Sequence, residues 1–164
     1  MIKKESRKLL INNAFLLDGT GSPALENGAL LIEGNRITSV GSSDEVKTPS
    51  DAKVLDVEGK TIMPGLIDLH IHLAGVVDDP TEPNYGTWAC LEYTWAKTPM
   101  SLLLLNAARN ARLMIESGFT TVKDMLGYTN YDNIALRKAV EIGLVPGPRI
   151  FTTGSVVQTG GHLT

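Results

Sequence analysis

Short apolar runs separated by turn residues dominate the first 63 residues of the chain. Glycine, asparagine, aspartate and proline lie between the runs, and these residues allow or fix the backbone angles that a chain reversal needs. The four residues Glu33, Gly34, Asn35 and Arg36 are typical of a tight hairpin between two strands. The pattern predicts an all-β module, a small β-sandwich or meander, with strands at residues 9–11, 14–17, 29–32, 36–40 and 53–57.

After residue 63 the pattern changes to strands that alternate with helices. Ser101 is expected to cap the first helix and Gly118 to end it. Strand, helix, strand, helix, strand is the order of parallel βαβ units. We therefore expect an α/β chain with an N-terminal β domain over residues 1–63 and a second domain over residues 64–164. The second domain is predicted to have strands at 66–72, 119–125 and 149–153 and helices at 101–117 and 131–142.

Polar and apolar residues alternate along the first strand of the second domain. Successive side chains of a strand point to opposite faces, so each kind shares one face. One face is expected to pack and the other to carry chemistry. The polar face holds Asp68, His70 and His72, and the apolar face holds Ile67, Leu69 and Ile71.

The pair His70 and His72 is the strongest chemical signal in the chain. Residues two apart on a strand are about 6.6–7 Å apart, so two imidazoles on one face can tilt toward one divalent metal. The strand's C-terminal end is where active sites of parallel α/β folds gather. Imidazole accepts zinc, iron, nickel and cobalt alike. Two histidines at this spacing also occur as a surface pair or as a buried, hydrogen-bonded pair.

Charge, cysteine content and the length of the apolar runs limit the partners and the cellular location that we expect. With 15 basic and 18 acidic side chains the net charge is −3, which offers no basic face for a nucleic acid. The single cysteine, Cys90, cannot form an internal disulfide, so a cytoplasmic location is expected. No apolar run approaches the ~18 residues that cross a bilayer, so no membrane partner is expected.

The segment MPGLIDLHIH, residues 63–72, strongly resembles the P-G-[LFM]-[IV]-D-x-H-x-H signature of the metal-dependent amidohydrolase superfamily. The β-module is similar to that superfamily's flanking domain, and GFTTVKD at 118–124 looks like its second barrel strand. GPR at 147–149 followed by TGGH at 159–162 resembles the branch of imidazolonepropionase-related proteins and Xaa-Pro dipeptidases.

The resemblance implies a (β/α)8 TIM-type barrel with one or two divalent metals, commonly zinc, that activate water for attack on an amide or related carbon–nitrogen bond. His70 and His72 match the two metal ligands of the first strand. Asp68 matches an acidic position that is not itself a ligand, and either orients an imidazole N–H or makes a purely structural hydrogen bond. His162 is expected to contact substrate, the alternative being an exposed loop histidine. The superfamily's carbamylated lysine, further histidines and general-base aspartate have no counterpart here, so no catalytic residue is assigned.

Length limits what the chain does alone. A closed barrel takes about 250 residues, whereas 100 residues follow Pro64 and supply three strands. We expect an incomplete barrel whose missing C-terminal segment, or a partner in a homo-oligomer, supplies the rest. The isolated chain is then inactive, and the intact protein hydrolyses a small amide, cyclic amide or dipeptide.

Two alternatives differ in class. One is a non-catalytic fragment, a structural or oligomerisation module of an amidohydrolase-like protein. The other is a different metallohydrolase, such as a phosphoesterase. Against the phosphoesterase stand the N-terminal β-module and Ala74, which occupies the position of a third alternate histidine.

Overall fold

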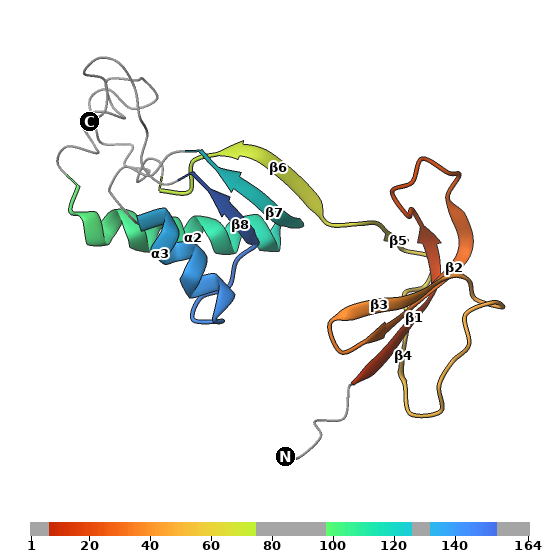
Figure 1. Cartoon of the computed structure of the whole chain (residues 1–164). Coiled ribbons are helices and arrows are strands. Elements are labelled where there is room, and N and C mark those ends of the chain that lie inside the picture. The colour runs from red at the N-terminus through yellow and green to blue at the C-terminus, as the bar shows by residue number, and fades with distance from the viewer. Residues whose placement is uncertain (1–6, 75–97, 126–131, 154–164) are drawn as a thin grey trace. The chain divides into compact units, whose positions relative to one another are not determined.

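The computed structural model describes residues 7–74, 98–125 and 132–153 of the chain. It divides into two compact units, Met1–Pro64 and Gly65–Thr164. In Figure 1 the first unit carries strands β1 to β5 and the second carries β6, α2, β7, α3 and β8. Among the described residues, no helix is both long enough and apolar enough to cross a membrane.

The first unit is one mixed five-stranded sheet. Its order is β3-β2-β1-β4, and β5 also pairs with β1. Strand β1 is antiparallel to β2 and parallel to β4 and β5, and β2 is antiparallel to β3. The buried side chains of Leu10, Ala29, Leu31 and Val46 form its core. The strands are β1 (Lys8–Leu16), β2 (Leu25–Glu33), β3 (Arg36–Ser42), β4 (Lys53–Asp56) and β5 (Thr61–Ile62).

The predicted β-module is confirmed, including its hairpin, in which Glu33 pairs with Arg36 across a loop with Gly34 at φ 65°. The separate strands predicted at 9–11 and 14–17 were wrong, because both belong to β1. Asn13, which lies between the two predicted strands, has φ 55° where the ladder shifts register, so it makes a bulge inside β1. The described residues of this unit form one sheet, and the second layer of the predicted sandwich is not among them.

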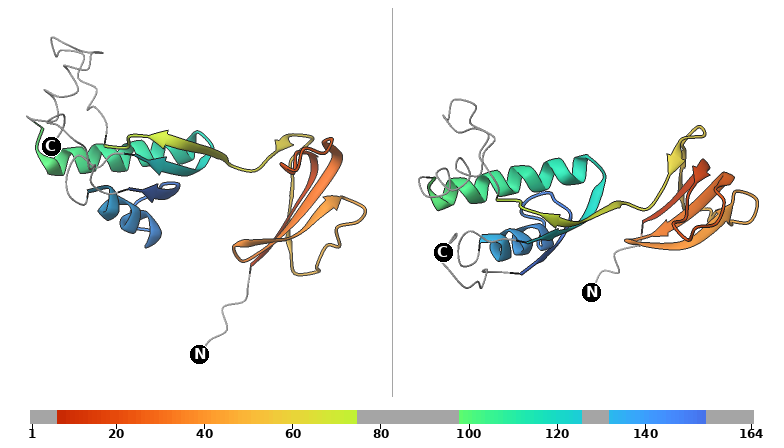
Figure 2. Two further views of the ribbon diagram at one scale, coloured as in Figure 1. Left: turned by 45° about the horizontal axis from the view of Figure 1, so that its top comes forward. Right: turned by 90° about the horizontal axis from the view of Figure 1, so that it is seen from above.

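The second unit is a parallel three-stranded sheet in the order β6-β7-β8. Helix α2 packs on β7, α3 packs on β8, and the two helices contact each other, so both cover one face of the sheet (Figure 2). The predicted βαβ pattern is therefore confirmed. Its elements are β6 (Leu66–Ile71), α2 (Met100–Glu116), β7 (Phe119–Asp124), α3 (Asp132–Glu141) and β8 (Arg149–Thr152).

Buried aliphatic side chains join these layers. Small residues let α2 approach the sheet closely, and two of them, Ala107 and Ala111, are almost completely buried. The other members of the core come from the residues after β6, from β7 and β8, and from α3: Leu73, Ala74, Val122, Ile150 and Leu136. This core fixes α2 against the sheet beside the end of β6, which matters for the site described below.

The ends of α2 follow one prediction and contradict another. Gly118, at φ 90°, ends the helix as predicted. Ser101 does not cap it, because the N-cap is Pro99, which has no side-chain hydrogen bond. The Pro99 carbonyl instead accepts the N–H groups of Leu102 at 2.8 Å and Leu103 at 3.2 Å, so the backbone alone closes the first turn.

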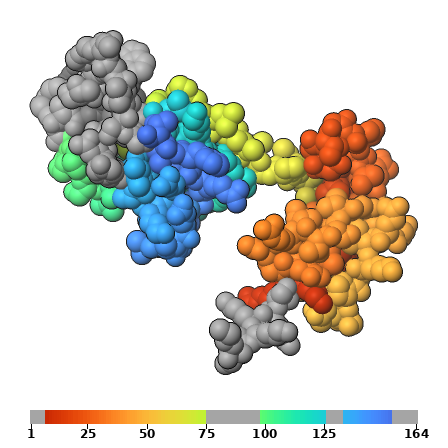
Figure 3. Space-filling view, viewed as in Figure 1, coloured from red at the N-terminus to blue at the C-terminus, as the bar shows by residue number. Residues whose placement is uncertain are grey.

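The predicted packing face of β6 is only partly packed. Ile71 contacts the core, whereas the side chains of Ile67 and Leu69 are 62% and 68% exposed. The space-filling view shows the yellow-green atoms of this part of the chain at the surface of the second unit (Figure 3). We call Ile67 and Leu69 the open side of β6.

Candidate metal centre

A bulge shapes the end of β6. Asp68 pairs with Val122 and Ile71 pairs with Asp124, so three steps along β6 match two along β7. Leu69 and His70 lie within this irregular stretch, where the ladder is interrupted. A bulge changes the direction of the side chains it carries. The two histidines are therefore presented by a locally distorted strand rather than by a regular one.

Asp68 stabilises this distortion. Its Oδ1 accepts the backbone N–H of His70 at 3.0 Å, which is the short-range turn that aspartate favours. The carboxylate thus contacts the main chain of the histidine. Of the two roles weighed for Asp68, this contact corresponds to the structural hydrogen bond.

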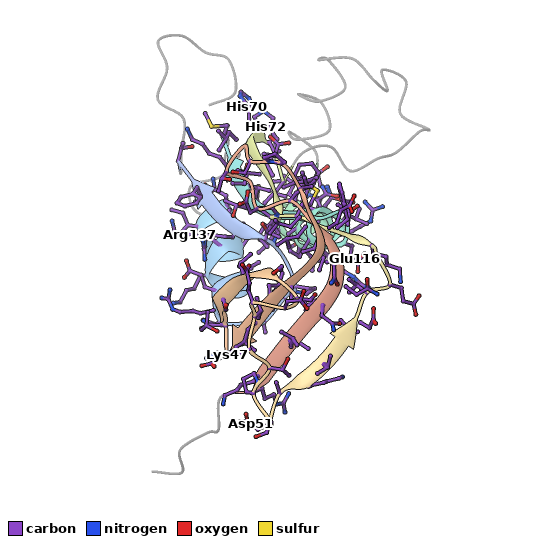
Figure 4. The ribbon with its side chains drawn as sticks, turned by 90° about the vertical axis from the view of Figure 1, so that its right-hand side faces the viewer. Lys47, Asp51, His70, His72, Glu116 and Arg137 are labelled. Atoms are coloured by element: carbon purple, nitrogen blue, oxygen red, sulfur yellow. The ribbon has the colours of Figure 1, made fainter. Side chains whose placement is uncertain are left out.

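The imidazoles of His70 and His72 lie side by side at the end of β6 (Figure 4). Their ring centroids are 5.4 Å apart and their planes meet at 85°. Two rings that share a tetrahedral zinc, with nitrogens about 2.1 Å from the metal, would have centroids about 5 Å apart. The observed separation therefore fits two imidazoles on one metal ion, and their neutral nitrogens are suitable donors.

The pair is only part of a ligand set. Within residues 7–74, 98–125 and 132–153, no group of three or more His, Cys, Asp or Glu side chains could hold a metal ion. Both imidazoles are also exposed. A complete centre thus needs ligands from outside this described part of the chain. His162 and Cys90 lie outside the described residues as well.

The surroundings of His72 favour the neutral form of its ring. Partial burial, and secondly the nearby His70, lower the pKa of His72 below its usual 6.5. A proton competes with a metal for the same nitrogen, so this shift keeps the His72 nitrogens available at lower pH.

We expect His72 to titrate below 6.5 when its Cε1–H resonance is followed by NMR, and His70→Ala to move its midpoint upward. The unfolded chain takes up a proton at His72 more readily than the folded chain does. The folded state is therefore favoured fully at a pH above the pKa of His72 in the unfolded chain, and this contribution is lost as the pH falls through the lower pKa of His72 in the folded chain. A midpoint at or above 6.5 would contradict the lowered pKa described for His72.

Of the two residues next to the pair, Asn110 was given no role from the sequence, and Asp124 was read either as part of the pocket rim or as a solvated strand end. Asn110 of α2 donates from Nδ2 to the carbonyl of Leu73 at 2.9 Å, and Asp124 is completely buried at the end of β7. The available signal was an asparagine on the side of α2 that also carries Ala107 and Ala111. A polar residue among core positions usually has a specific hydrogen-bond partner.

Comparisons with known proteins agree with the family that the sequence motif resembles. The profile of the Amidohydrolase family matches residues 61–160, more than half of the chain. Ochratoxinase from Aspergillus niger is 30% identical over 168 aligned residues, which cover 96% of this chain and 30% of that protein.

Solved structures agree in fold. A crystal structure of an amidohydrolase is 39% identical, with a TM-score of 0.72, over 90% of this chain and 32% of the other. A Xaa-Pro dipeptidase with methionine bound in its active site is 26% identical, with a TM-score of 0.74, over 95% of this chain and 36% of the other. The chain thus spans about a third of the length of these relatives and matches the N-terminal portion of amidohydrolase structures.

Proposed function

Because this chain belongs to the Amidohydrolase family, we propose that the protein containing it is a metal-dependent hydrolase of carbon–nitrogen bonds. The observation that carries the proposal is the contact between the imidazoles of His70 and His72, 5.4 Å apart at the end of β6. The proposed substrates are small amides, cyclic amides or dipeptides. The likeness to a Xaa-Pro dipeptidase with bound methionine supports the dipeptide in particular.

Each residue near the end of β6 has a distinct part in this proposal. His70 and His72 hold a divalent metal, most simply zinc, through one ring nitrogen each. The metal supplies activation of a water molecule and polarisation of the substrate carbonyl. Asp68 holds the His70 main chain through its 3.0 Å hydrogen bond and so keeps that ring in place. His162 contacts the substrate.

The same proposal gives each unit a place in a larger protein. The β-sheet of the first unit is one part of a composite β-sandwich. The sheet β6-β7-β8 provides the first three strands of a (β/α)8 barrel. The chain spans 30% of ochratoxinase, so the remaining strands and ligands come from further chain or from a partner copy. The 164-residue chain alone is inactive, since two imidazoles do not complete a catalytic centre.

The test compares the 164-residue chain with the full product of the gene that encodes it. We expect the full product to contain zinc by elemental analysis and to hydrolyse members of a panel of Xaa-Pro dipeptides and N-acyl amino acids. A chelator should abolish this hydrolysis and added Zn²⁺ should restore it, while the shorter chain shows no turnover. A full product that neither binds metal nor cleaves any of the panel would reject the proposal and favour the non-catalytic module.

A further inference from the structure

The backbone of the residue that follows the histidine pair is hydrogen-bonded at both its N–H and its carbonyl. Leu73 comes directly after His72 and is 2% exposed. Both polar groups of its backbone are contacted by side chains of other elements, one from α2 and one from β7. Backbone groups beyond the end of a strand no longer have ladder partners, so buried ones need other hydrogen bonds.

The carbonyl and the amide of Leu73 are contacted separately. Nδ2 of Asn110, a half-buried residue of α2, donates to the Leu73 carbonyl at 2.9 Å. The Leu73 N–H donates to Oδ1 of Asp124, the last residue of β7, over a longer 3.4 Å. Asp124 is 0% exposed, so water does not compete for its carboxylate.

The residue before His72 is fixed as well. The carbonyl of Ile71 accepts the N–H of Met125 at 3.0 Å. His72 therefore lies between two neighbours whose backbones are both tied to other elements. Because a Cα–Cβ bond follows the local backbone, the direction of the His72 side chain is set by these contacts more than by its own partly exposed ring.

We propose that Asn110 and Asp124 are positioning residues, which hold the backbone of Leu73 and thereby direct the His72 imidazole toward the metal. This inference rests on the proposed metal role of His70 and His72. Neither residue touches the imidazole in the proposal, and each acts through Leu73. Groups that orient metal ligands without touching the metal typically change metal affinity by 10–100-fold when they are lost.

The experiment uses the 164-residue chain, with Co²⁺ as the probe and two readouts. The first is the dissociation constant for Co²⁺. The second is the NOE between ring protons of His70 and His72 in the metal-free chain. We expect Asn110→Ala to weaken Co²⁺ binding about 10-fold and to weaken the NOE. Asp124→Leu should do the same, whereas Asp124→Asn, which keeps an oxygen acceptor for the Leu73 N–H, should recover most of the affinity.

Leu136→Ala is the control for a purely structural effect. Leu136 is a core residue of α3, 2% exposed, whose aliphatic side chain cannot form a hydrogen bond with the Leu73 backbone. Its loss should lower stability but leave the NOE intact. The inference is overturned if Asn110→Ala binds Co²⁺ within two-fold of the parent chain and keeps the NOE, or if Leu136→Ala reduces both readouts equally. In a parent chain whose incomplete ligand set binds no Co²⁺, the NOE alone would decide the positioning, and the metal role would be decided by the zinc content of the full gene product.

Discussion

Replacing either His70 or His72 by alanine is expected to lower the Zn²⁺ affinity of the full gene product by more than about 100-fold. We take about 100-fold as the lower limit because losing a residue that only orients a metal ligand already reduces metal affinity 10–100-fold. Each replacement removes a nitrogen donor from a pair whose rings are 5.4 Å apart. Metal content after dialysis and hydrolysis of the best dipeptide in the panel are the measurements, and both should fall together.

His162→Ala is the matched control for this pair, since it removes the remaining histidine of the chain. We expect this variant to retain its metal and to show a raised KM, in line with a role in substrate contact. Retention of metal and full activity in both His70→Ala and His72→Ala would reject their assignment as ligands. Loss of metal in His162→Ala would instead add that residue to the ligand set.

Gly65→Ala is expected to destabilise the second unit by about 3 kcal/mol, at the upper end of the effect of overpacking. A Cβ at this position would overlap the Thr120 side chain on β7, with the Thr120 Cβ only 2.6 Å away. Threonine branches at Cβ and so has no flexible end that could move aside. Strand β6 would have to separate from β7 at the point where the Leu66 N–H donates to the Gly118 carbonyl at 2.9 Å.

Hydrogen exchange at the Leu66 amide measures this effect directly. Gly65→Ala should accelerate its exchange by about 100-fold, as expected for 3 kcal/mol. Combining Gly65→Ala with Thr120→Gly removes the three atoms nearest to the new Cβ, so the double variant should recover protection relative to Gly65→Ala. Gly41→Ala is the mild control, since its Cβ would meet the mobile carboxylate end of Glu45 at 3.2 Å. Unchanged exchange in Gly65→Ala would contradict the described packing of β6 on β7.

The sequence was sufficient to predict those parts of the structure that a local pattern determines. The alternation of residues 66–72 predicted a strand, and β6 covers Leu66–Ile71. The hairpin at Gly34 and the helix end at Gly118 followed from residues that tolerate a positive φ. The histidine pair could be found because its spacing and its surrounding motif are both contained in ten consecutive residues.

Features that depend on distant partners were not predictable in the same way. The continuity of β1 across Asn13 was missed because its bulge is supported from β4, where Asp56 Oδ1 accepts the Asn13 Nδ2–H at 2.9 Å. The bulge beside His70 depends on the register between β6 and β7. The role inferred for Asn110 arises from a contact with Leu73, 37 positions earlier in the chain. Such pairings are decided by tertiary packing, which no single segment encodes.

The open side of β6 has a consequence for biosynthesis. Ile67 and Leu69 leave the ribosome early, and in the described structure both remain largely in contact with water. A nascent chain with such aliphatic groups on a strand is a natural client for holding chaperones and is prone to aggregate until it is covered. In the proposed barrel, synthesis of the residues that cover this side would decide when the polypeptide no longer needs a chaperone. Coexpression of a separate covering segment is then expected to keep the chain in solution.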